Sequence, residues 1–324
     1  MLLIITNKSD LAVDYLILRL EERGFIFFRI NTEDFGHDFF IEFFVKDNIL
    51  DGNINSNIHG CLSLSNISAV YFRQPLVPQI ENTFIPNQIK FVQRESMEVL
   101  RSLWRLIPEG KWLNDPRNMF LASNKLDQIK NAISIGFDVP NTLVSTDSEK
   151  IKEFILSQNG HCIAKAVKHG FYNDGSKVQL AFTKRIGTDF MEHIDRYSAV
   201  PMTYQNEIEK EYDIRVIVIE DQVFATAIYS QEYKSTAVDW RTWDVLEDVD
   251  LEHAKITLPP NIEKKCVQLT KLYQLKYSAI DLVKSTDGTF YFLELNPNGQ
   301  WAWIEGKVGY PIRDSLINAF HFDQ

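Results

Sequence analysis

The amino-acid sequence predicts an α/β module followed by α+β modules, and two observations carry this prediction. Near the start, strand and helix patterns alternate: an apolar strand at residues 2–6, an amphipathic helix at 10–23 that ends at Gly24, and a strand at 25–30. In the last third, strands follow one another with only short turns between them, which is typical of antiparallel sheets. We therefore expect a doubly wound α/β module first and antiparallel sheets flanked by helices later.

The first module is expected to continue to about residue 113. Residues 39–45 and 69–73 have the composition of strands, and residues 87–105 show apolar side chains at helical spacing. The segment Asn114-Asp115-Pro116 combines two helix-capping residues with a proline suited to a first helical turn. We expect a domain boundary there.

The elements after this boundary predict two further domains. They are helices at 126–135, 148–157 and 261–272, strands at 141–145, 161–167, 178–183 and 202–205, a hairpin of 212–219 with 223–230 turned at Glu220-Asp221, and a hairpin of 277–283 with 289–295 turned at Asp287-Gly288. The predicted domains are residues 1–113, 114–190 and 191–324.

The composition argues against several classes of protein. The net charge of −10 disfavours a general binder of nucleic acid or anionic membranes, because such proteins need clustered lysine and arginine. The three cysteines form no CxxC pair, which indicates neither a disulfide framework nor a thiolate zinc site, and makes a reducing, cytoplasmic setting the default. No apolar run approaches the roughly 20 residues that a membrane span requires.

The strongest chemical pattern is a set of oxygen-bearing side chains on the last two predicted strands, Asp281, Glu294 and Asn296. Glu294 and Asn296 lie two apart and share a strand face, while the Asp287-Gly288 turn brings the strand with Asp281 alongside. Mg²⁺ prefers oxygen ligands and usually takes one or two carboxylates. Solvated or ion-paired acidic residues are the usual alternative, but the bulky apolar neighbours of Glu294 favour a metal site.

A glycine-bearing loop at residues 170–177 has the glycine spacing of a P-loop, but it ends in Ser176-Lys177, where that motif has the lysine first. A strand follows instead of a helix, which excludes a Walker A motif. Glycines still allow a loop between strands to fold over phosphates with backbone N–H groups. An ordinary surface loop is the equally good alternative.

Two lysines are candidates for phosphate contacts. Lys165 lies in an apolar strand with Ile163 and Val167 on its face, and burying its ammonium group is costly unless an anion such as a phosphate compensates. A lone strand lysine is otherwise normally an exposed edge residue. Lys125, at the start of a predicted helix, is the weaker candidate because helical lysines are usually solvated.

A further candidate segment, residues 205–208, leads into a strand on which Asp213 and Arg215 share a face. Arginine is suited to gripping a carboxylate or a phosphate with two parallel hydrogen bonds. A surface salt bridge between Asp213 and Arg215 is the alternative.

Taken in order, these residues resemble the ATP-grasp superfamily. The resemblance implies an ATP-grasp fold with an N-terminal Rossmann-like pre-ATP-grasp domain, a central small domain and a C-terminal antiparallel-sheet domain, with ATP and Mg²⁺ as cofactors. It also implies the roles of residues. Lys125 and Lys165 contact phosphates, and Gln205, Asn206, Glu207 and Ile208 form the adenine segment, a hinge whose backbone around Glu207 and Ile208 meets the adenine. Asp213 helps to hold the nucleotide, and Asp281, Glu294 and Asn296 bind Mg²⁺.

Within that superfamily, the chain is similar to the microviridin-type, or graspetide, peptide ligases. The similar pieces are Val70-Tyr71-Phe72-Arg73, residues 202–208, Tyr229-Ser230-Gln231, Val238-Asp239-Trp240-Arg241 and Asn296-Pro297-Asn298-Gly299-Gln300-Trp301. The family commonly has an acidic residue where Gln300 stands and two adjacent arginines where this chain has Arg73-Gln74. Both departures point to a different precursor specificity and leave the nucleotide residues unaffected.

This second resemblance implies that the chain phosphorylates an Asp or Glu side chain of a ribosomal precursor peptide and joins it to Ser, Thr or Lys of the same peptide as an ester or amide ring. Arg215 would hold the carboxylate and the later oxyanion, and Arg241 is a second candidate for phosphate contact, with a solvated surface arginine as its alternative. The precursor peptide is the implied partner, and a homodimer is implied by the resemblance alone. The rival functions are a ligase for free amino acids or protein termini, and a non-enzymatic ATP- or peptide-binding regulator.

Overall fold

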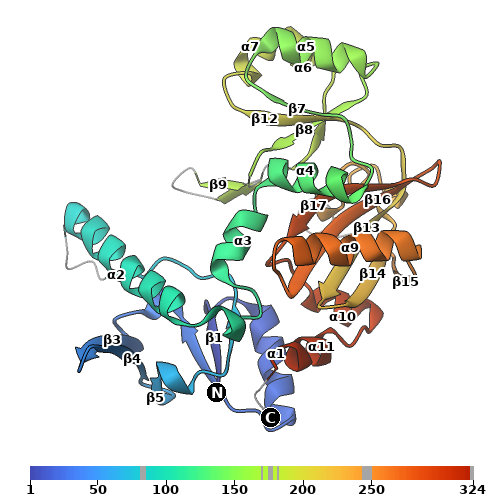
Figure 1. Cartoon of the computed structure of the whole chain (residues 1–324). Helices are drawn as coiled ribbons and strands as arrows, with labels where there is room; N and C mark the ends of the chain where they lie inside the picture. Colours follow the sequence, from blue (N-terminus) through green and yellow to red (C-terminus); the bar gives the residue numbers. More distant parts are fainter. Residues whose placement is uncertain (81–84, 169–170, 174–177, 181, 243–249, 322–324) are drawn as a thin grey trace. The chain divides into compact units, whose positions relative to one another are not determined.

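The computed structural model describes residues 1–80, 85–168, 171–173, 178–180, 182–242 and 250–321 (Figure 1). The chain folds into two compact units. Unit 1 consists of Met1–Leu121, Thr270–Ser278 and Pro297–Gln324, and unit 2 consists of Ala122–Leu269 and Ala279–Asn296. Each unit is therefore built from segments that are distant in the sequence, and the three-domain division remains a prediction.

Unit 1 begins with a parallel sheet. Strands β1 (Leu2–Thr6), β2 (Phe27–Asn31) and β6 (Ala69–Phe72) lie in the order β2-β1-β6, and the helix α1 (Leu11–Glu22) connects the first two. All five side chains of β1 are buried, as expected for a central strand that is covered on both faces. The predicted α/β start of the chain is confirmed.

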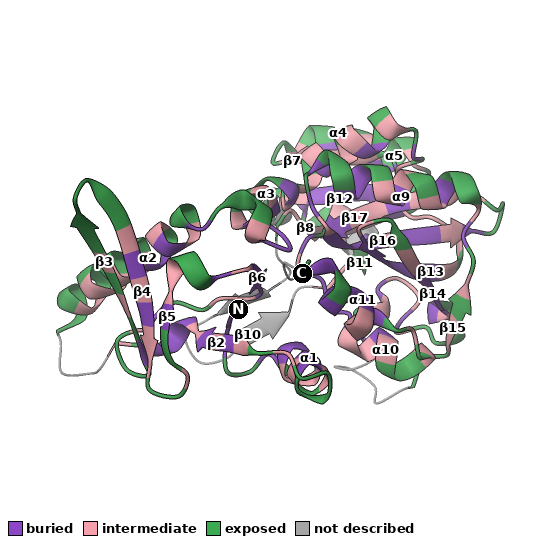
Figure 2. Cartoon of the chain, turned by 60° about the horizontal axis from the view of Figure 1, so that its bottom comes forward, coloured by how far each residue is buried: buried purple, intermediate pink, exposed green. Residues whose placement is uncertain are grey.

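A second, antiparallel sheet in unit 1 was only partly predicted. It contains β3 (Phe39–Lys46), β4 (Ile49–Ser56) and β5 (Gly60–Ser63) in the order β3-β4-β5. Asp47 and Asn48 both have positive φ, 51° and 62°, and turn β3 back into β4, because Asp and Asn tolerate this conformation in two-residue hairpins. The polar middle of β4 hides its strand character in the sequence, whereas β3 alone was expected; Figure 2 shows how exposed β3 is.

The remaining helices of unit 1 come from both ends of the chain. They are α2 (Pro86–Leu106), most of α3 (Pro116–Ala122), α10 (Ala302–Val308) and α11 (Ile312–Ala319). The helix α11 packs beside α1, and Arg19 Nε lies 2.9 Å from Asp314 Oδ1. Fully buried Trp301 donates its indole N–H to Tyr71 Oη at 3.2 Å. The sequence did not predict α10 and α11.

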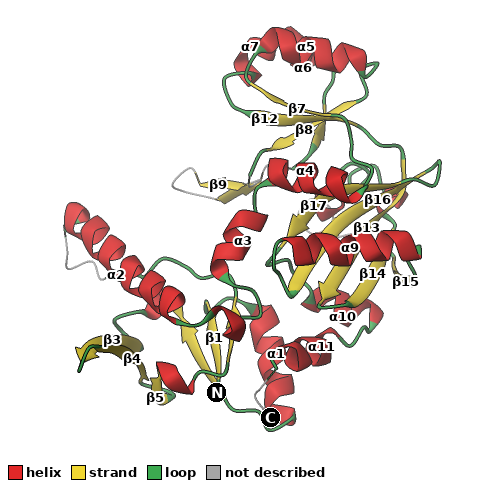
Figure 3. Cartoon of the chain, viewed as in Figure 1, coloured by secondary structure: helices red, strands yellow, loops and turns green. Residues whose placement is uncertain are grey.

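Unit 2 contains a small antiparallel sheet with helices on one face (Figure 3). The sheet order is β11-β8-β12-β7, with β7 (Thr142–Ser145), β8 (Cys162–Ala166), β11 (Lys184–Arg185) and β12 (Met202–Asn206). The helices are α5 (Ser148–Ser157), α6 (Thr188–Glu192) and α7 (Ile194–Tyr197). Side chains from α5, including Ile151 and Ile155, form a core with Tyr204 of β12. This arrangement confirms the predicted antiparallel pairing.

The glycine-bearing loop falls largely outside the described residues. Phe171–Asn173, within the predicted loop, form the strand β9, which pairs antiparallel with β10 (Val178–Leu180) as a two-stranded sheet, so the prediction of a loop over these three residues was wrong. Gly170 and residues 174–177 lie outside the described part of the chain.

The larger sheet of unit 2 holds five of the twelve candidate residues, among them the three predicted metal ligands. Its order is β15-β14-β13-β16-β17, with β13 (Lys210–Ile219), β14 (Gln222–Ile228), β15 (His253–Ile256), β16 (Tyr277–Ser285) and β17 (Phe290–Asn296), and its neighbouring helices are α4 (Lys125–Ile135) and α9 (Pro260–Leu272). Both predicted hairpins are confirmed. Glu220 has φ +54° in the first turn and Gly288 has φ +89° in the second.

Gln128 fastens α4 to the strand that carries Glu294. Its side chain is 2% exposed; Nε2 donates to Ala122 O at 2.6 Å and Leu295 O at 2.7 Å, and Oε1 accepts from Leu295 N at 2.9 Å. A buried amide with both ends paired fixes the position of α4 along β17.

In the described residues, no helix combines the length and the apolar character that crossing a membrane requires.

Replacing Gln128 with leucine is expected to destabilise unit 2 by about 3 kcal/mol, because the backbone groups of Leu295 and Ala122 lose their partners while staying buried. Urea denaturation should show the loss, with Lys130→Gln on the exposed face of the same helix as the control. Equal stability of the two variants would contradict this account.

Candidate active site

The two predicted metal carboxylates lie opposite each other on neighbouring strands. Asp281 of β16 and Glu294 of β17 are Cα partners in the antiparallel register, so their side chains leave the same face of the sheet. Asn296, two residues after Glu294, is the exposed last residue of β17. The structure therefore brings the two carboxylates together as the sequence predicts and leaves Asn296 at the strand end.

An irregularity in this pairing sets which side chains face the site. The register shifts between Asp281 and Leu282, so that Leu282 pairs with Phe292 and Leu293 has no partner. The extra residue reverses the alternation of β17: Phe292 is 1% exposed on one face, while Glu294, two residues later, faces Asp281 on the other. Bulges of this kind re-aim side chains beside functional sites.

Each of the two carboxylates has a cation beside it. Lys125 Nζ lies 2.8 Å from Glu294 Oε2, and Arg215 Nη1 lies 3.0 Å from Asp281 Oδ1. Lys125 is placed by the start of α4, where the Asn124 side chain caps the helix by accepting from the backbone N–H groups of the second and third helical residues. The second pair is a close contact between charges but not a hydrogen bond. Asp281 Oδ1 and Arg215 Nε are both buried without a hydrogen-bond partner among the described residues.

The two carboxyl groups differ in acidity. Burial raises the pKa of Asp281 to about 6, and the nearby Arg215 only partly opposes it. Burial also acts to raise the pKa of Glu294, but Lys125 and Lys165 outweigh it and lower that pKa to about 2. Glu294 is thus firmly ionised, whereas Asp281 is held near the point where it accepts a proton.

Lys165 lies within electrostatic reach of the same group. Burial lowers the pKa of Lys165 on β8 to about 8; Glu294 opposes this shift, and Lys125 and Arg241 add to it. The structure therefore joins Lys125, Lys165 and Glu294 into one cluster of charges. A buried lysine that is only partly compensated favours an arriving anion.

Asp213 and Arg215 do not form the intra-strand salt bridge that was the alternative reading. Asp213 is 4% exposed and accepts two hydrogen bonds from Lys210 Nζ, at 2.9 Å and 2.7 Å, and one from Ser230 Oγ. Burial raises its pKa, against the effect of Lys210. Sequence reasoning missed Lys210 and Ser230 as partners of Asp213; residues three apart on a strand leave opposite faces, so the spacing of Lys210 and Asp213 gave no signal.

Arg241 is anchored by Asp239, which sequence reasoning also missed as a site residue. Arg241 Nε lies 2.8 Å and Nη2 lies 2.7 Å from the two oxygens of Asp239, which also accepts from Thr183 N at 3.1 Å. Half of the Arg241 side chain is exposed. The guanidinium of Arg215 lies 5.6 Å from the ring centre of Trp240. The segment 239–241 therefore supplies a fixed, half-exposed cation beside the aromatic ring that supports Arg215.

The predicted adenine segment divides into two pairs. Gln205, 1% exposed, donates to Thr142 Oγ1 at 2.8 Å, and its Oε1 and Asn206 Oδ1 are buried without partners in the described structure. Glu207, by contrast, donates its backbone N–H to His161 O at 2.9 Å and pairs with Arg185 at 2.7 Å. Ile208, half-buried, follows at the end of this segment.

The residues present fit a magnesium nucleotide. Two adjacent carboxylates suit Mg²⁺, which takes one or two carboxylates and leaves positions for phosphate oxygens, and the unpaired oxygens of Gln205 and Asn206 can accept from an amino group such as that of adenine. In the described residues, no group of three or more His, Cys, Asp or Glu is arranged to hold a metal ion. A cation that needs a full protein cage is therefore a poorer fit.

The fold and the charged side chains of the site together match an enzyme that works on a magnesium nucleotide. Comparison with known proteins identifies its family. A model of the RimK-like ATP-grasp domain matches residues 122–320, and a model of the MvdD pre-ATP-grasp domain matches residues 1–119. The chain belongs to the RimK-like ATP-grasp family. It is an ATP-grasp ligase, as the sequence predicted.

Solved structures of similar fold cover almost the whole chain. A Chryseobacterium gregarium RiPP-associated ATP-grasp ligase, in complex with ADP and a leader and core peptide, is 24% identical with a TM-score of 0.89 over 98% of this chain and 96% of that one. The macrocyclase MdnC from Microcystis aeruginosa MRC, bound with the precursor peptide MdnA, is 23% identical with a TM-score of 0.85 over 98% of each chain. The ATP-grasp ligase PsnB, complexed with minimal precursor, Mg and ADP, is 22% identical with a TM-score of 0.74 over 98% of each chain.

A curated relative lies further away. A probable alpha-L-glutamate ligase of Haemophilus influenzae (strain ATCC 51907 / DSM 11121 / KW20 / Rd) is 26% identical over 215 residues, which is 65% of this chain and 67% of that protein.

We expect nucleotide binding to take up a proton above about pH 8, because a bound phosphate favours the ammonium form of Lys165, whose pKa is about 8 in the free protein. The depressed pKa leaves Lys165 neutral at higher pH, so affinity for ADP should fall as the pH rises from about 7 to about 9. Calorimetry in buffers of different ionisation enthalpy measures the uptake. In Lys165→Arg, which stays charged, the uptake and the pH dependence should both disappear; a wild-type protein without proton uptake contradicts the assignment.

Proposed function

We propose that this chain uses ATP to activate Asp or Glu side chains of a ribosomally made precursor peptide and closes ester or amide rings with Ser, Thr or Lys of the same peptide. Three things support the proposal: the ATP-grasp family, the separate match of residues 1–119 to an MvdD pre-ATP-grasp domain, and a fold shared over 98% of the chain with ligases bound to precursor peptides. The partner is then a peptide and not a nucleic acid.

The observation that carries the proposal is the paired charge arrangement in unit 2. Two close ion pairs form there, one between Lys125 and Glu294 and one between Arg215 and Asp281. Lys165 lies beside them, and its positive charge is only partly compensated. Separating these pairs requires a ligand that brings both signs of charge. A magnesium nucleotide does so, since phosphates suit the lysines and the metal suits the carboxylates.

A carboxylate is a poor electrophile because an oxide ion is a very poor leaving group. ATP, when bound, supplies the γ-phosphoryl group that turns the carboxylate into an acyl phosphate, from which phosphate departs. Lys125 and Lys165 would neutralise phosphate charge, and Asp281 and Glu294, with Asn296, would hold Mg²⁺. Arg215, supported by the ring of Trp240, would orient the substrate carboxylate and stabilise the oxyanion that forms when the nucleophile attacks.

The other predicted residues would bind the nucleotide or the acyl phosphate. The buried oxygens of Gln205 and Asn206 would accept from adenine, with Glu207 and Ile208 as the neighbouring segment. Asp213, fixed by Lys210 and Ser230, would hold the nucleotide from β13. Arg241, fixed by Asp239 and half-exposed, would contact phosphate. From the family resemblance we also propose a homodimer that works in the cytoplasm.

The rival function is the addition of free amino acids to an acceptor, which the similarity to a probable alpha-L-glutamate ligase favours. It would use the same nucleotide residues, so only the substrate distinguishes the two functions. Ring closure within one peptide removes water, whereas addition of an amino acid increases the acceptor's mass.

Mass spectrometry of a candidate precursor peptide, encoded beside the gene and rich in Thr with Glu or Asp, tests the proposal after incubation with the protein, ATP and Mg²⁺. We expect the loss of one water per ring, with methanolysis opening esters but not amides. An ATP-dependent gain of one amino-acid residue would support the rival function, and absence of ADP formation would contradict both.

The same assay should show that Arg215→Lys slows ring formation by about 10²-fold, because lysine lacks the fork that holds an oxyanion. Affinity for ADP should change little, which separates Arg215 from the nucleotide residues. Arg196→Lys, an exposed arginine of α7, is the matched control. Unchanged ring formation in Arg215→Lys would remove Arg215 from the mechanism.

A further inference from the structure

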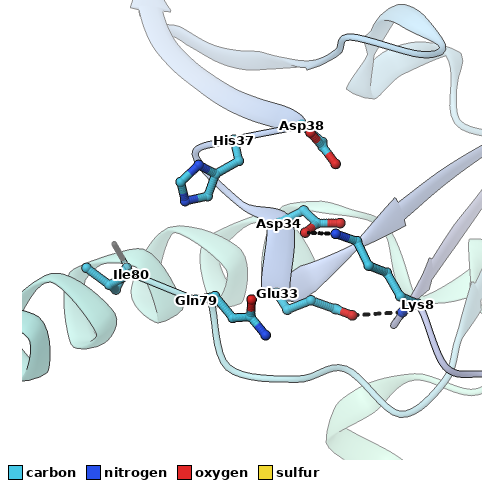
Figure 4. A pocket seen from close by; sticks show the side chains of 7 residues that line it. All are labelled: Lys8, Glu33, Asp34, His37, Asp38, Gln79 and Ile80. Atoms are coloured by element: carbon cyan, nitrogen blue, oxygen red, sulfur yellow. Dashed lines mark hydrogen bonds and ion pairs between the residues drawn. The ribbon is translucent and has the colours of Figure 1, made fainter. Parts of the chain in front are cut away.

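A hollow of about 370 Å³ lies in unit 1, on elements other than those that carry the residues of the ATP-grasp site. Its walls follow the carboxyl ends of the parallel strands: Lys8 comes after β1, Glu33 and Asp34 belong to the 3-10 helix η1 (Thr32–Asp34) after β2, and Gln79 comes after β6. This edge of an open parallel sheet is where ligands bind in α/β folds. The full lining is Lys8, Glu33, Asp34, His37, Asp38, Gln79 and Ile80 (Figure 4).

The lining carries an excess of negative charge. Glu33, Asp34 and Asp38 contribute three carboxylates, and Lys8 contributes one ammonium group, which leaves two negative charges with His37 neutral. Lys8 Nζ lies 2.5 Å from Asp34 Oδ1, and the backbone N–H of Lys8 donates to Glu33 Oε1 at 2.7 Å. One cation of the chain itself is thus already bound, and the hollow still attracts another.

Two of these carboxylates are buried with one oxygen unused. Glu33 is 4% exposed and Asp34 is 7% exposed, yet Glu33 Oε2 and Asp34 Oδ2 have no hydrogen-bond partner among the described residues. A buried carboxylate oxygen without a donor leaves negative charge uncompensated. The two unpaired oxygens therefore add to the negative potential at the wall of the hollow, which favours a cationic ligand.

The frame around these carboxylates is fixed by backbone contacts. Gln79 N donates to Glu33 O at 2.9 Å. The Thr32 hydroxyl donates to Leu76 O at 2.7 Å and accepts from Leu76 N at 2.7 Å. The segment after β6 is thereby held against η1. A site whose walls are tied in this way needs little rearrangement to bind a ligand.

The chemistry of the lining selects the kind of ligand. An anion is disfavoured by the surplus carboxylates, and in the described residues no group of three or more His, Cys, Asp or Glu is arranged to hold a metal ion. An ammonium or guanidinium group offers both positive charge and N–H donors. Ile80, across the hollow from Asp34 and Asp38 in Figure 4, provides an apolar surface for the methylene chain behind such a group.

We propose that this hollow binds a lysine or arginine side chain of the precursor peptide. The identity of the peptide rests on the proposed function, whereas the preference for a cationic side chain rests on the lining alone. The hollow then acts as a second contact for the substrate, on the pre-ATP-grasp unit, and selects peptides with a basic residue.

Binding of small probes to the full-length, nucleotide-free protein tests the proposal by saturation-transfer NMR and calorimetry. Nα-acetyl-lysine N-methylamide and its arginine counterpart should bind, the norleucine counterpart should not, and added salt should weaken binding. Asp38→Asn, an exposed substitution that spares the fold, should weaken the lysine probe by at least about threefold. Glu33→Gln should weaken it further, and Glu42→Gln on β3, outside the hollow, should change nothing.

Three outcomes overturn the proposal: binding of the norleucine probe as tight as that of the lysine probe, an unchanged affinity in Asp38→Asn, or displacement of the lysine probe by Mg²⁺ or Ca²⁺ at equal concentration. n-Butylammonium distinguishes the source of the cation, since equal binding of this simple amine overturns the assignment to a peptide. No ATP or turnover is involved, so probe binding without ring formation would refute only the proposed function, and ring formation without probe binding would refute only this inference.

Discussion

The site in unit 2 depends on the mutual neutralisation of partly buried charges. Glu294 faces Lys125 at 2.8 Å and Asp281 faces Arg215 at 3.0 Å, and each cation favours the ionised form of its carboxylate against the effect of burial. Four separate elements contribute these residues: α4, β13, β16 and β17. The buried Gln128, which joins α4 to β17, keeps the Lys125 end of the first pair in place.

This arrangement explains why the two carboxyl groups behave differently on one face of a sheet. Glu294 sits among lysines that outweigh burial and has a pKa of about 2, whereas at Asp281 burial outweighs Arg215 and the pKa is about 6. Because the charges of the site balance one another when no ligand is bound, like charges do not repel strongly and the site remains folded. The same charges can then exchange partners when a ligand brings a cation and an anion together.

Local patterns predicted much of the fold and the heart of the site, because short hairpins fix the neighbours of a strand. The Asp287-Gly288 turn pairs the strand of Asp281 with the strand of Glu294, as predicted, and the register shift between Asp281 and Leu282 then sets the two carboxylates opposite each other. The bulge at Leu293 could not be predicted, since neither the turn residues nor the apolar pattern of the strand marks the register shift. Partners distant in the sequence were missed because local patterns do not show them: Asp239 holds Arg241 and also accepts from Thr183 N, which comes from another part of the chain.

The central claim is that the two ion pairs separate when a magnesium nucleotide binds between their charges. The most direct test is to measure how strongly the nucleotide affinity depends on Mg²⁺. The affinity for a non-hydrolysable ATP analogue should be measured with and without Mg²⁺ in the wild type, in Glu294→Gln and in Glu211→Gln, an exposed acid of β13 paired with Lys284. The account predicts that Mg²⁺ strengthens binding by at least about tenfold in the wild type and the control, and by less than about twofold in Glu294→Gln. An equal effect of Mg²⁺ in all three proteins would contradict it.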